Sequence, residues 1–328
     1  MSQIDKVTPA GQRLVVSALR NRGQTMGLFL VLLIMGVVWS VLSPYFLTQS
    51  NLLNVLLQSS ITTIVAVGQT YVILTSGIDL SVGSVVALCA VVLGLLLKAG
   101  VPVFVAIPAA LVAGMIIGLV NGVIITKASV PPFIMTLGMM GIARGLALIL
   151  TGGQSLYTFP EGFRFVFGSG FLWIIPMPAV IAAIVVGVGA YILHSTRFGR
   201  YIYAVGGNAE AARLSGLPVV RVTIGAYVVA GITYAIGAAV LTARINSAQP
   251  IAGQGYELDA IAAVVLGGTS LFGGEGSLFG TVLGALLMGV LRNGLNLLNV
   301  SSFVQQVIIG GVIILAVAVD KLRRRSGS

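Results

Sequence analysis

The sequence predicts an all-α polytopic membrane protein with about ten transmembrane helices, and three observations support this. The 328 residues have a mean hydropathy of +1.08, and 57% of them are apolar. Only 8% are charged, whereas soluble domains carry roughly 25% charged residues. The apolar stretches extend to about 20 residues, which suits membrane-spanning helices and exceeds the roughly 9–11 residues of a barrel strand.

Ten apolar windows, separated by glycine, proline and charged residues, predict the individual helices. They cover residues 26–44, 52–75, 82–97, 102–126, 132–151, 171–194, 222–243, 258–272, 278–298 and 303–319. A straight crossing needs about 20 residues. The third and eighth windows are shorter, so we expect broken or re-entrant helices there.

Positive charge predicts the orientation of the helices. The net charge is +10, and most Lys and Arg residues lie in the leader 1–25, the loop 195–221 and the tail 321–328. Because Lys and Arg favour the cytoplasmic side of a membrane, we expect both termini and this loop inside the cell. Residues 26–320 then form one transmembrane domain. The same clustering at membrane-flanking segments argues against a nucleic-acid-binding surface.

Two short motifs suggest an internal repeat. Gly77–Leu80 (GIDL) opens the third window, and Gly255–Leu258 (GYEL) opens the eighth. The match pairs spans 2–5 with spans 7–10, and an offset of five spans reverses their orientation. Inverted repeats of this kind build the central pathway of many transporters. Chance similarity within a glycine-rich apolar sequence is the alternative.

Acidic residues within the apolar region are candidates for a functional role. Asp79 lies between Ser76 and Ser81, in a break rich in glycine and hydroxyl groups. We expect Asp79 to cap the broken helix that follows, because a carboxylate is favoured at a helix N-terminus. A direct place in a pathway is the alternative. Glu257 and Asp259, before the eighth span, have the same two interpretations.

Basic and amide residues within the spans predict contacts between helices. Arg144 lies in the fifth span and Arg292 in the ninth, and each is expected to pair with an intramembrane acid or to bind a backbone carbonyl. Asn121 and Asn293 are expected to bridge neighbouring helices. Three glycines at small-xxx-small spacing predict close packing of the fourth span: Gly114, Gly118 and Gly122.

The sequence argues against an enzyme. None of its four lysines lies in the G-x-x-x-x-G-K-[ST] pattern of a nucleotide-binding P-loop. His194 is the single histidine and Cys89 the single cysteine, so neither a metal cluster nor a nucleophile–base pair is predicted. We expect no cofactor bound by this chain. Acids are scarce within the spans, which favours coupling to a partner motor over an ion-coupled carrier.

A short polar helix is predicted in the loop between the sixth and seventh spans. The stretch Gly206–Leu217 reads GGNAEAARLSGL. Asn208 is a suitable N-cap, Glu210 falls in the first turn, and Gly216 is placed to end the helix. Two turns span roughly 12 Å, which is too short to cross a membrane. Its alanine-rich surface is suited to seat in the cleft of another protein on the cytoplasmic side.

Three passages resemble the permease subunits of bacterial ribose-type sugar ABC importers. They are Leu74–Ser84, Arg197–Asn208 with the helix after it, and Gly255–Thr269. The resemblance covers nearly the whole chain, and the stretch Ser247–Pro250 is most similar to the ribose members.

The resemblance implies a division of labour in the bacterial inner membrane. Two permease subunits, here a homodimer, form the pathway in the lipid bilayer. A cytoplasmic ATPase binds ATP and Mg, and a periplasmic sugar-binding protein delivers the cargo. The implied cargo is ribose; another pentose or hexose, a nucleoside or an autoinducer-like sugar are alternatives.

The resemblance also assigns residues to roles. The predicted helix resembles the coupling helix that contacts the ATPase, formed by Asn208, Ala209, Glu210, Ala211, Ala212, Arg213, Leu214, Ser215 and Gly216. Candidates for the pathway or for broken helices are Ser76, Asp79, Ser81, Asn121, Arg144, Glu257, Asp259 and Asn293.

Overall fold

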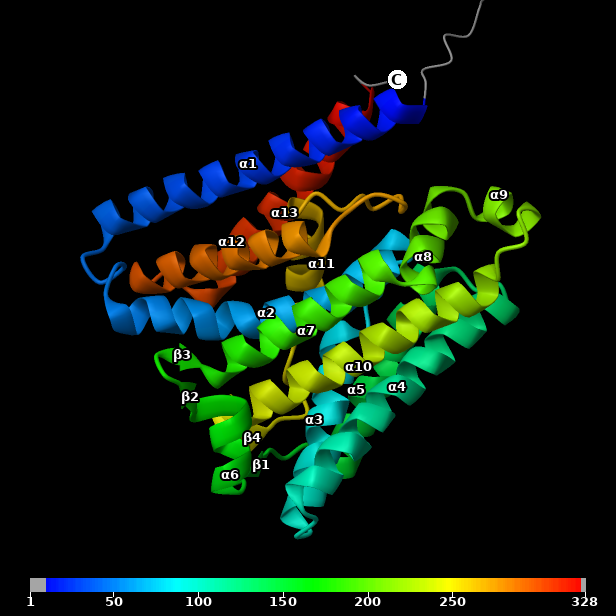
Figure 1. The fold of residues 1–328 in the computed structure, drawn as a ribbon. Coiled ribbons are helices and arrows are strands. Elements are labelled where there is room, and N and C mark those ends of the chain that lie inside the picture. The colour runs from blue at the N-terminus through cyan, green and yellow to red at the C-terminus, as the bar shows by residue number, and fades with distance from the viewer. Residues whose placement is uncertain (1–9, 326–328) are drawn as a thin grey trace, which may run out of the picture.

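The computed structural model describes residues 10–325, which form a bundle of helices (Figure 1). The helices are α1 (Ala10–Leu42), α2 (Gln49–Leu74), α3 (Val82–Lys98), α4 (Val103–Lys127), α5 (Pro132–Thr151), α6 (Glu161–Arg164), α7 (Met177–Ser195), α8 (Arg197–Gly207), α9 (Ala209–Leu214), α10 (Val219–Ile245), α11 (Tyr256–Leu266), α12 (Leu278–Leu297) and α13 (Ser302–Arg325). A π-helical turn, η1 (Phe165–Ser169), follows α6. Two antiparallel strand pairs complete the fold: β1 (Leu156–Tyr157) with β4 (Ser247–Ala248), and β2 (Phe171–Leu172) with β3 (Ile175–Pro176).

Within residues 10–325, six helices are long and apolar enough to cross a membrane: α2, α4, α5, α7, α10 and α12. Shorter apolar helical stretches cover Met26–Leu42, Val82–Lys98 and Ser302–Leu315. The polytopic helical fold predicted from composition is therefore confirmed, while the count of ten spans stays a prediction.

Two predicted boundaries were wrong. The window 171–194 becomes helical only at Met177, because residues 171–176 form the β2–β3 hairpin and Pro176 precedes the helix. The window 258–272 ends as a helix at Leu266, where a turn containing Gly268 at φ +86° follows. In the first span, α1 begins at Ala10, and its apolar stretch Met26–Leu42 agrees with the predicted window 26–44.

The contacts between helices form two matching sets. Helix α10 packs along α4, and α2 packs along α12 in the same way. Helix α3 contacts α4 and α5, while α11 contacts α12 and α13. The short helices also cross over, α3 to α10 and α11 to α2. Each of these contacts made by the segment α2–α5 therefore has a counterpart in the segment α10–α13.

Glycines bring α4 and α10 into close contact. A Cβ atom at Gly114 would overlap the carbonyl oxygen of Gly231, and one at Gly118 would overlap that of Tyr227. Gly122 lies equally close to Ile224. The small-xxx-small prediction for the fourth span is confirmed, because only glycine allows this approach of two backbones.

The two ends of the bundle differ. Helix α9 projects at one end, and α6 with the β1–β4 pair lies at the other (Figure 1). Helix α10 therefore begins at the end of the bundle where α9 lies, and it ends next to β4 at the opposite end. Between these ends, α2, α3 and α10 share the largest cluster of buried apolar side chains.

Candidate functional site

Two irregular segments, 75–81 and 249–255, interrupt the bundle and precede its short helices. Helix α3 has 17 residues and α11 has 11. Gly83, in the first turn of α3, lies against the carbonyl group of Gly253 and the carboxylate of Glu257. The N-terminal ends of α3 and α11 therefore meet inside the bundle. Helix N-termini carry free N–H groups and a partial positive charge, so this meeting point favours polar or negative groups.

Asp79 stabilises the turn ahead of α3 but does not occupy the N-cap position expected for it. Ser81 holds that position. One carboxylate oxygen of Asp79 accepts hydrogen bonds from the Ser81 backbone N–H at 2.8 Å and from its hydroxyl at 2.6 Å. The Asn121 amide donates a longer bond to the same hydroxyl at 3.4 Å. Asp79 is buried, and this local network holds the turn that precedes α3.

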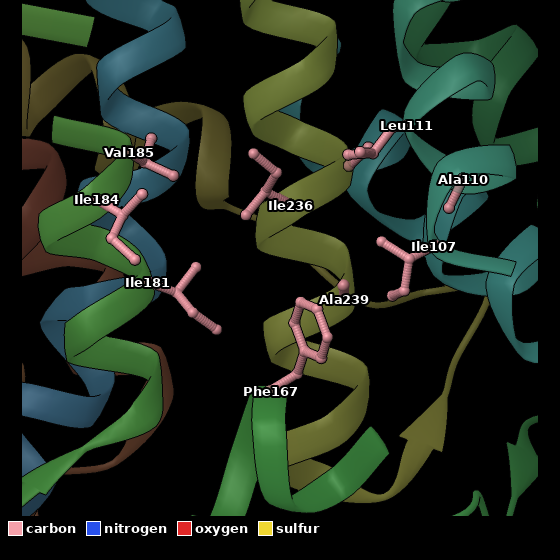
Figure 2. A pocket seen from close by; sticks show the side chains of 10 residues that line it. Ile107, Ala110, Leu111, Phe167, Ile181, Ile184, Val185, Ile236 and Ala239 are labelled. Carbon is pink, nitrogen blue, oxygen red and sulfur yellow. The ribbon is translucent and has the colours of Figure 1, made fainter. Parts of the chain in front are cut away.

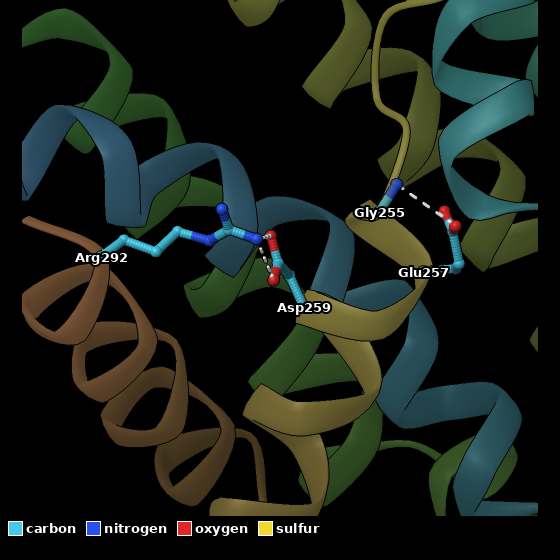
Figure 3. A network of polar contacts seen from close by, with 4 residues as sticks. All are labelled: Gly255, Glu257, Asp259 and Arg292. Atoms are coloured by element: carbon cyan, nitrogen blue, oxygen red, sulfur yellow. Dashed lines mark hydrogen bonds and ion pairs between the residues drawn. The ribbon is translucent and has the colours of Figure 1, made fainter. Parts of the chain in front are cut away.

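The two GxxL motifs are not structurally equivalent. Gly77–Leu80 ends before α3 begins, whereas Gly255–Leu258 enters the first turn of α11. Consequently Asp79 precedes its helix, while Glu257 lies within one and accepts a bond from the Gly255 N–H at 3.2 Å (Figure 3).

Of the two contacts predicted for the arginines within the spans, Arg292 pairs with an acid and Arg144 binds backbone carbonyls. The Arg292 guanidinium donates to both carboxylate oxygens of Asp259, at 2.7 and 2.9 Å (Figure 3). The Arg144 guanidinium instead donates to the carbonyl oxygens of Pro250 and Ala252, at 2.6 and 3.0 Å. Arg144 thereby holds the irregular segment 249–255 against α5.

Asn293 bridges α12 and α2, as predicted. Its side-chain amide exchanges two hydrogen bonds with that of Asn51, at 2.8 and 2.9 Å. Because both amides are buried, the exchange satisfies groups that would otherwise be costly in an apolar interior.

The short polar helix predicted in the loop is present. Helix α9 covers Ala209–Leu214, between the predicted N-cap Asn208 and the predicted terminating residue Gly216. The Asn208 side chain accepts a bond from the Ala211 N–H at 2.9 Å, so the predicted N-cap is confirmed. Gly216 follows with φ +78°, a conformation that glycine adopts readily at the end of a helix.

One predicted contact residue of α9 faces inward. Ala212 is 5% exposed and packs in an apolar cluster with Val205 and Val222. Ala211 is exposed, and Leu214 is 79% exposed. The surface that α9 can offer a partner is therefore the Ala211–Leu214 side, and the expectation that Ala212 belongs to it was wrong.

The sequence reasoning did not identify a junction where three separate segments meet. We call it the three-segment junction: Leu74–Ser76 after α2, Gly206–Gly207 at the end of α8, and Phe272–Gly276 before α12. The Gly274 N–H donates to the Leu74 carbonyl at 3.0 Å. The Ser76 hydroxyl lies 2.8 Å from the Phe272 carbonyl oxygen and 3.2 Å from that of Gly206. The junction thus connects the α8–α9 segment to both halves of the bundle.

Ser76 has an unusual backbone conformation at this junction. Its φ is +63°, in the left-handed region that usually favours glycine at a helix C-terminus. A non-glycine residue there costs of order 1 kcal/mol, and here its hydroxyl contacts offset that cost. The glycine-rich spacing around residues 206 and 273–274 was the available signal, because closely approaching backbones require it.

Tyr203 adds a further bond at the junction. Its hydroxyl donates to the Gly276 carbonyl at 2.9 Å. Burial raises the pKa of Tyr203 to about 12, so it keeps the proton that it donates at neutral pH.

A cavity between α4, α7 and α10 is unsuited to a polar ligand. It has a volume of about 230 Å³ and is lined by apolar side chains, among them Ile107, Phe167, Ile181 and Ile236 (Figure 2). A neutral polar molecule would lose its hydrogen bonds to water there without replacement.

Substitutions around Asp79 test its structural role. Asp79→Asn keeps an acceptor oxygen for Ser81, so we expect a loss of about 1 kcal/mol or less in the free energy of unfolding. Gly83→Ala is expected to cost more, because its methyl group would overlap the Gly253 carbonyl. Thermal unfolding of the purified protein in detergent measures both. If Asp79→Asn unfolds normally yet abolishes activity, Asp79 acts on a ligand and not on the turn.

Comparison with known proteins places the chain among transport proteins. A family model described as branched-chain amino acid transport system / permease component matches residues 51–317. The ribose import permease protein of Escherichia coli (strain K12) is 49% identical over 298 residues, which cover 90% of this chain and 93% of that protein. The ribose import permease protein of Bacillus subtilis (strain 168) is 46% identical, with 91% and 93% covered. The D-allose transport system permease protein of Escherichia coli (strain K12) is 39% identical, with 90% and 91% covered. No solved structure gives a significant match.

Proposed function

Because this chain belongs to the family of branched-chain amino acid transport system permease components, we propose that it is the membrane-spanning subunit of an ATP-driven ribose importer. It is a multi-pass protein of the bacterial inner membrane and a permease subunit, so the ATPase is a separate partner. The observation that carries the choice of cargo is the identity of 49% and 46% to two ribose import permeases, against 39% to the D-allose permease.

The proposed topology is ten spans with both termini in the cytoplasm and an inverted repeat that relates α2–α5 to α10–α13. The matching neighbour sets of these two segments support the repeat. So do the two irregular segments, 75–81 and 249–255, each of which precedes a short helix. In transporters built this way, broken helices place the substrate path near the middle of the membrane.

The proposed complex contains a second copy of this permease, a cytoplasmic ATPase that binds ATP and Mg, and a periplasmic sugar-binding protein. We assign α9 as the coupling helix that seats in the ATPase. Its support is its place at the end of the bundle opposite α6 (Figure 1) and its exposed Leu214, the one large apolar side chain of this helix.

The proposed mechanism is alternating access driven from α9. ATP-dependent closure of the ATPase moves α9, and α8 carries the movement to the three-segment junction. Ser76 and Gly274 there connect to the irregular segment before α3 and to the loop before α12. A displacement of α9 therefore reaches both halves of the bundle, and the pathway opens to the periplasm. Hydrolysis returns it to the resting state.

Reconstitution in liposomes tests the function. Permease, ATPase and binding protein together are expected to accumulate D-ribose when ATP is enclosed with the ATPase. The same vesicles without the ATPase are expected to accumulate none. Uptake of D-allose, arabinose or galactose in place of ribose would keep the transporter class and change the cargo. Uphill uptake by the permease alone under an ion gradient would instead identify a secondary transporter.

The coupling assignment predicts a strong effect at α9. Leu214→Asp is expected to weaken ATPase binding by at least about 30-fold, because central apolar contacts of an interface contribute about 2 kcal/mol or more. Leu214 is exposed in this chain, so the permease itself is expected to remain folded. Co-purification of the two subunits measures the effect.

Leu172→Asp is the matched control for this test. Leu172 is also an exposed leucine, at 54% against 79% for Leu214, but it lies in the β2–β3 hairpin. We expect it to retain the ATPase. If both variants retain the ATPase equally, α9 does not contribute to the interface with the ATPase.

A further inference from the structure

A polar chamber lies between α2, α11, α12 and α13. Its volume is about 350 Å³, within the range of small-molecule sites. The side chains that line it include Gln58, Thr62, Gln254, Asp259, Arg292 and Gln305. Polar residues within membrane helices are costly and usually line water-filled paths. A cavity between α2, α7 and α12 is, in contrast, mostly apolar, although Thr63 contributes to it from the next position on α2.

The chamber lies toward the end of the bundle opposite α9. Gln254 lies in the segment that joins β4 to α11, and Arg244 lies at the C-terminal end of α10. In the proposed topology this is the periplasmic half, where a binding protein delivers its sugar. Tyr256 and Asp259, in the first turn of α11, also line the chamber.

The polar side chains of the chamber differ in the hydrogen bonds that they already make. Gln305 donates to the Asn296 side chain at 2.7 Å and to the Val300 carbonyl at 2.9 Å, so these groups hold each other in place. The Nε atom of Arg292 is buried and has no hydrogen-bond partner among the described residues. Gln58 and Thr62 project into the same space from successive turns of α2.

The charges of the chamber suit a neutral ligand. Asp259 and Arg292 neutralise one another through two hydrogen bonds. The remaining cation, Arg244, is exposed at the edge of the chamber. Amides, hydroxyls and a paired carboxylate offer donors and acceptors together, which is the combination that adjacent hydroxyl groups of a sugar require.

We propose that this chamber binds the sugar during its passage, with Gln58, Thr62 and the Asp259–Arg292 pair contacting its hydroxyl groups. The proposal rests on the proposed function and adds a location and a set of residues to it. Binding there is weak, because a pathway has to release what it binds.

Accessibility of introduced cysteines tests the location. The chain has one cysteine, Cys89, which is buried. In the complete transporter, Thr62→Cys is expected to react with a small water-soluble thiol reagent, and D-ribose is expected to slow the reaction several-fold. Thr63→Cys is the matched control on the same helix, since Thr63 faces the mostly apolar cavity. It is expected to react slowly and without any effect of ribose.

Transport measurements test the contacts. Gln58→Leu is expected to lower D-ribose uptake about tenfold, the loss of about one hydrogen bond to the ligand. Gln306→Leu is the control on α13, because Gln306 is exposed next to Gln305 and does not line the chamber. It is expected to transport normally.

The outcomes separate the two proposals. If the unmodified transporter takes up no sugar, the proposed function fails. If it transports ribose while ribose leaves the reaction of Thr62→Cys unchanged, the chamber is not on the path. Stronger protection by ribose 5-phosphate than by ribose would show an anion site and overturn the assignment to a neutral sugar. Should Gln58→Leu fail to assemble with the ATPase, the labelling of Thr62→Cys decides alone.

Discussion

Gly206→Ala is expected to destabilise the protein by about 1–3 kcal/mol, the usual cost of overpacking, and to uncouple transport from ATP hydrolysis. The added methyl group would overlap the carbonyl oxygen of Leu74 and approach the backbone nitrogen of Gly274. Both are backbone atoms of the three-segment junction, so neither can move aside as a flexible side chain could. The helix propensity of alanine, up to about 1 kcal/mol better than that of glycine, opposes the effect only in part.

Gly207 supplies the control for this experiment. A methyl group at Gly207 would meet no atom within 4 Å. We therefore expect Gly207→Ala to leave the melting temperature and ribose uptake close to those of the natural chain. The two variants are compared by thermal unfolding in detergent and by uptake per ATP hydrolysed. If both variants have the same melting temperature and the same uptake per ATP hydrolysed, the close packing at Gly206 contributes neither to stability nor to coupling.

Arg292→Met is expected to lower the free energy of unfolding by about 3–5 kcal/mol, because it leaves the Asp259 carboxylate buried without a partner. Asp259 is 4% exposed, whereas the Arg292 side chain is 34% exposed. Asp259→Asn is therefore expected to cost less, since water can solvate the remaining guanidinium. The two substitutions are therefore predicted to lower the free energy of unfolding by different amounts, although each removes the same ion pair.

The double variant Asp259→Asn/Arg292→Met is expected to recover much of the stability lost in Arg292→Met, because no charge then remains buried. Unfolding free energies of the four proteins form a double-mutant cycle. If the effects of the two single substitutions add, the interaction between Asp259 and Arg292 contributes nothing to the free energy of unfolding. Because both residues line the polar chamber, the stability cycle is measured separately from transport.

Sequence reasoning predicted the elements that depend on local composition. The apolar windows located the helices because lipid requires about 20 apolar residues for each crossing. The α9 helix was predicted correctly at its N-terminus, where Asn208 provides a cap that depends only on residues three positions away. The pairing of Arg292 with an acid was one of the two alternatives predicted for it, although its partner was not named.

What could not be predicted depends on contacts between distant segments. Ala212 seemed available to a partner because a surface helix has no inherent buried side, and only its packing on Val222 decides the matter. The three-segment junction joins residues 76, 206 and 272, which are separated by more than sixty positions. The polar chamber likewise draws on five helices and on the segment before α11, and its residues show no shared sequence pattern.

The Ser76 hydroxyl has a single proton but faces two carbonyl oxygens, those of Gly206 and Phe272. It can donate fully to only one of them at a time. Rotation of the hydroxyl group about the Cβ–Oγ bond therefore exchanges one acceptor for the other while the number of hydrogen bonds stays the same. In the proposed mechanism, this exchange allows α8 and α9 to shift relative to α2 while the Ser76 hydroxyl keeps a hydrogen bond to one of the two segments.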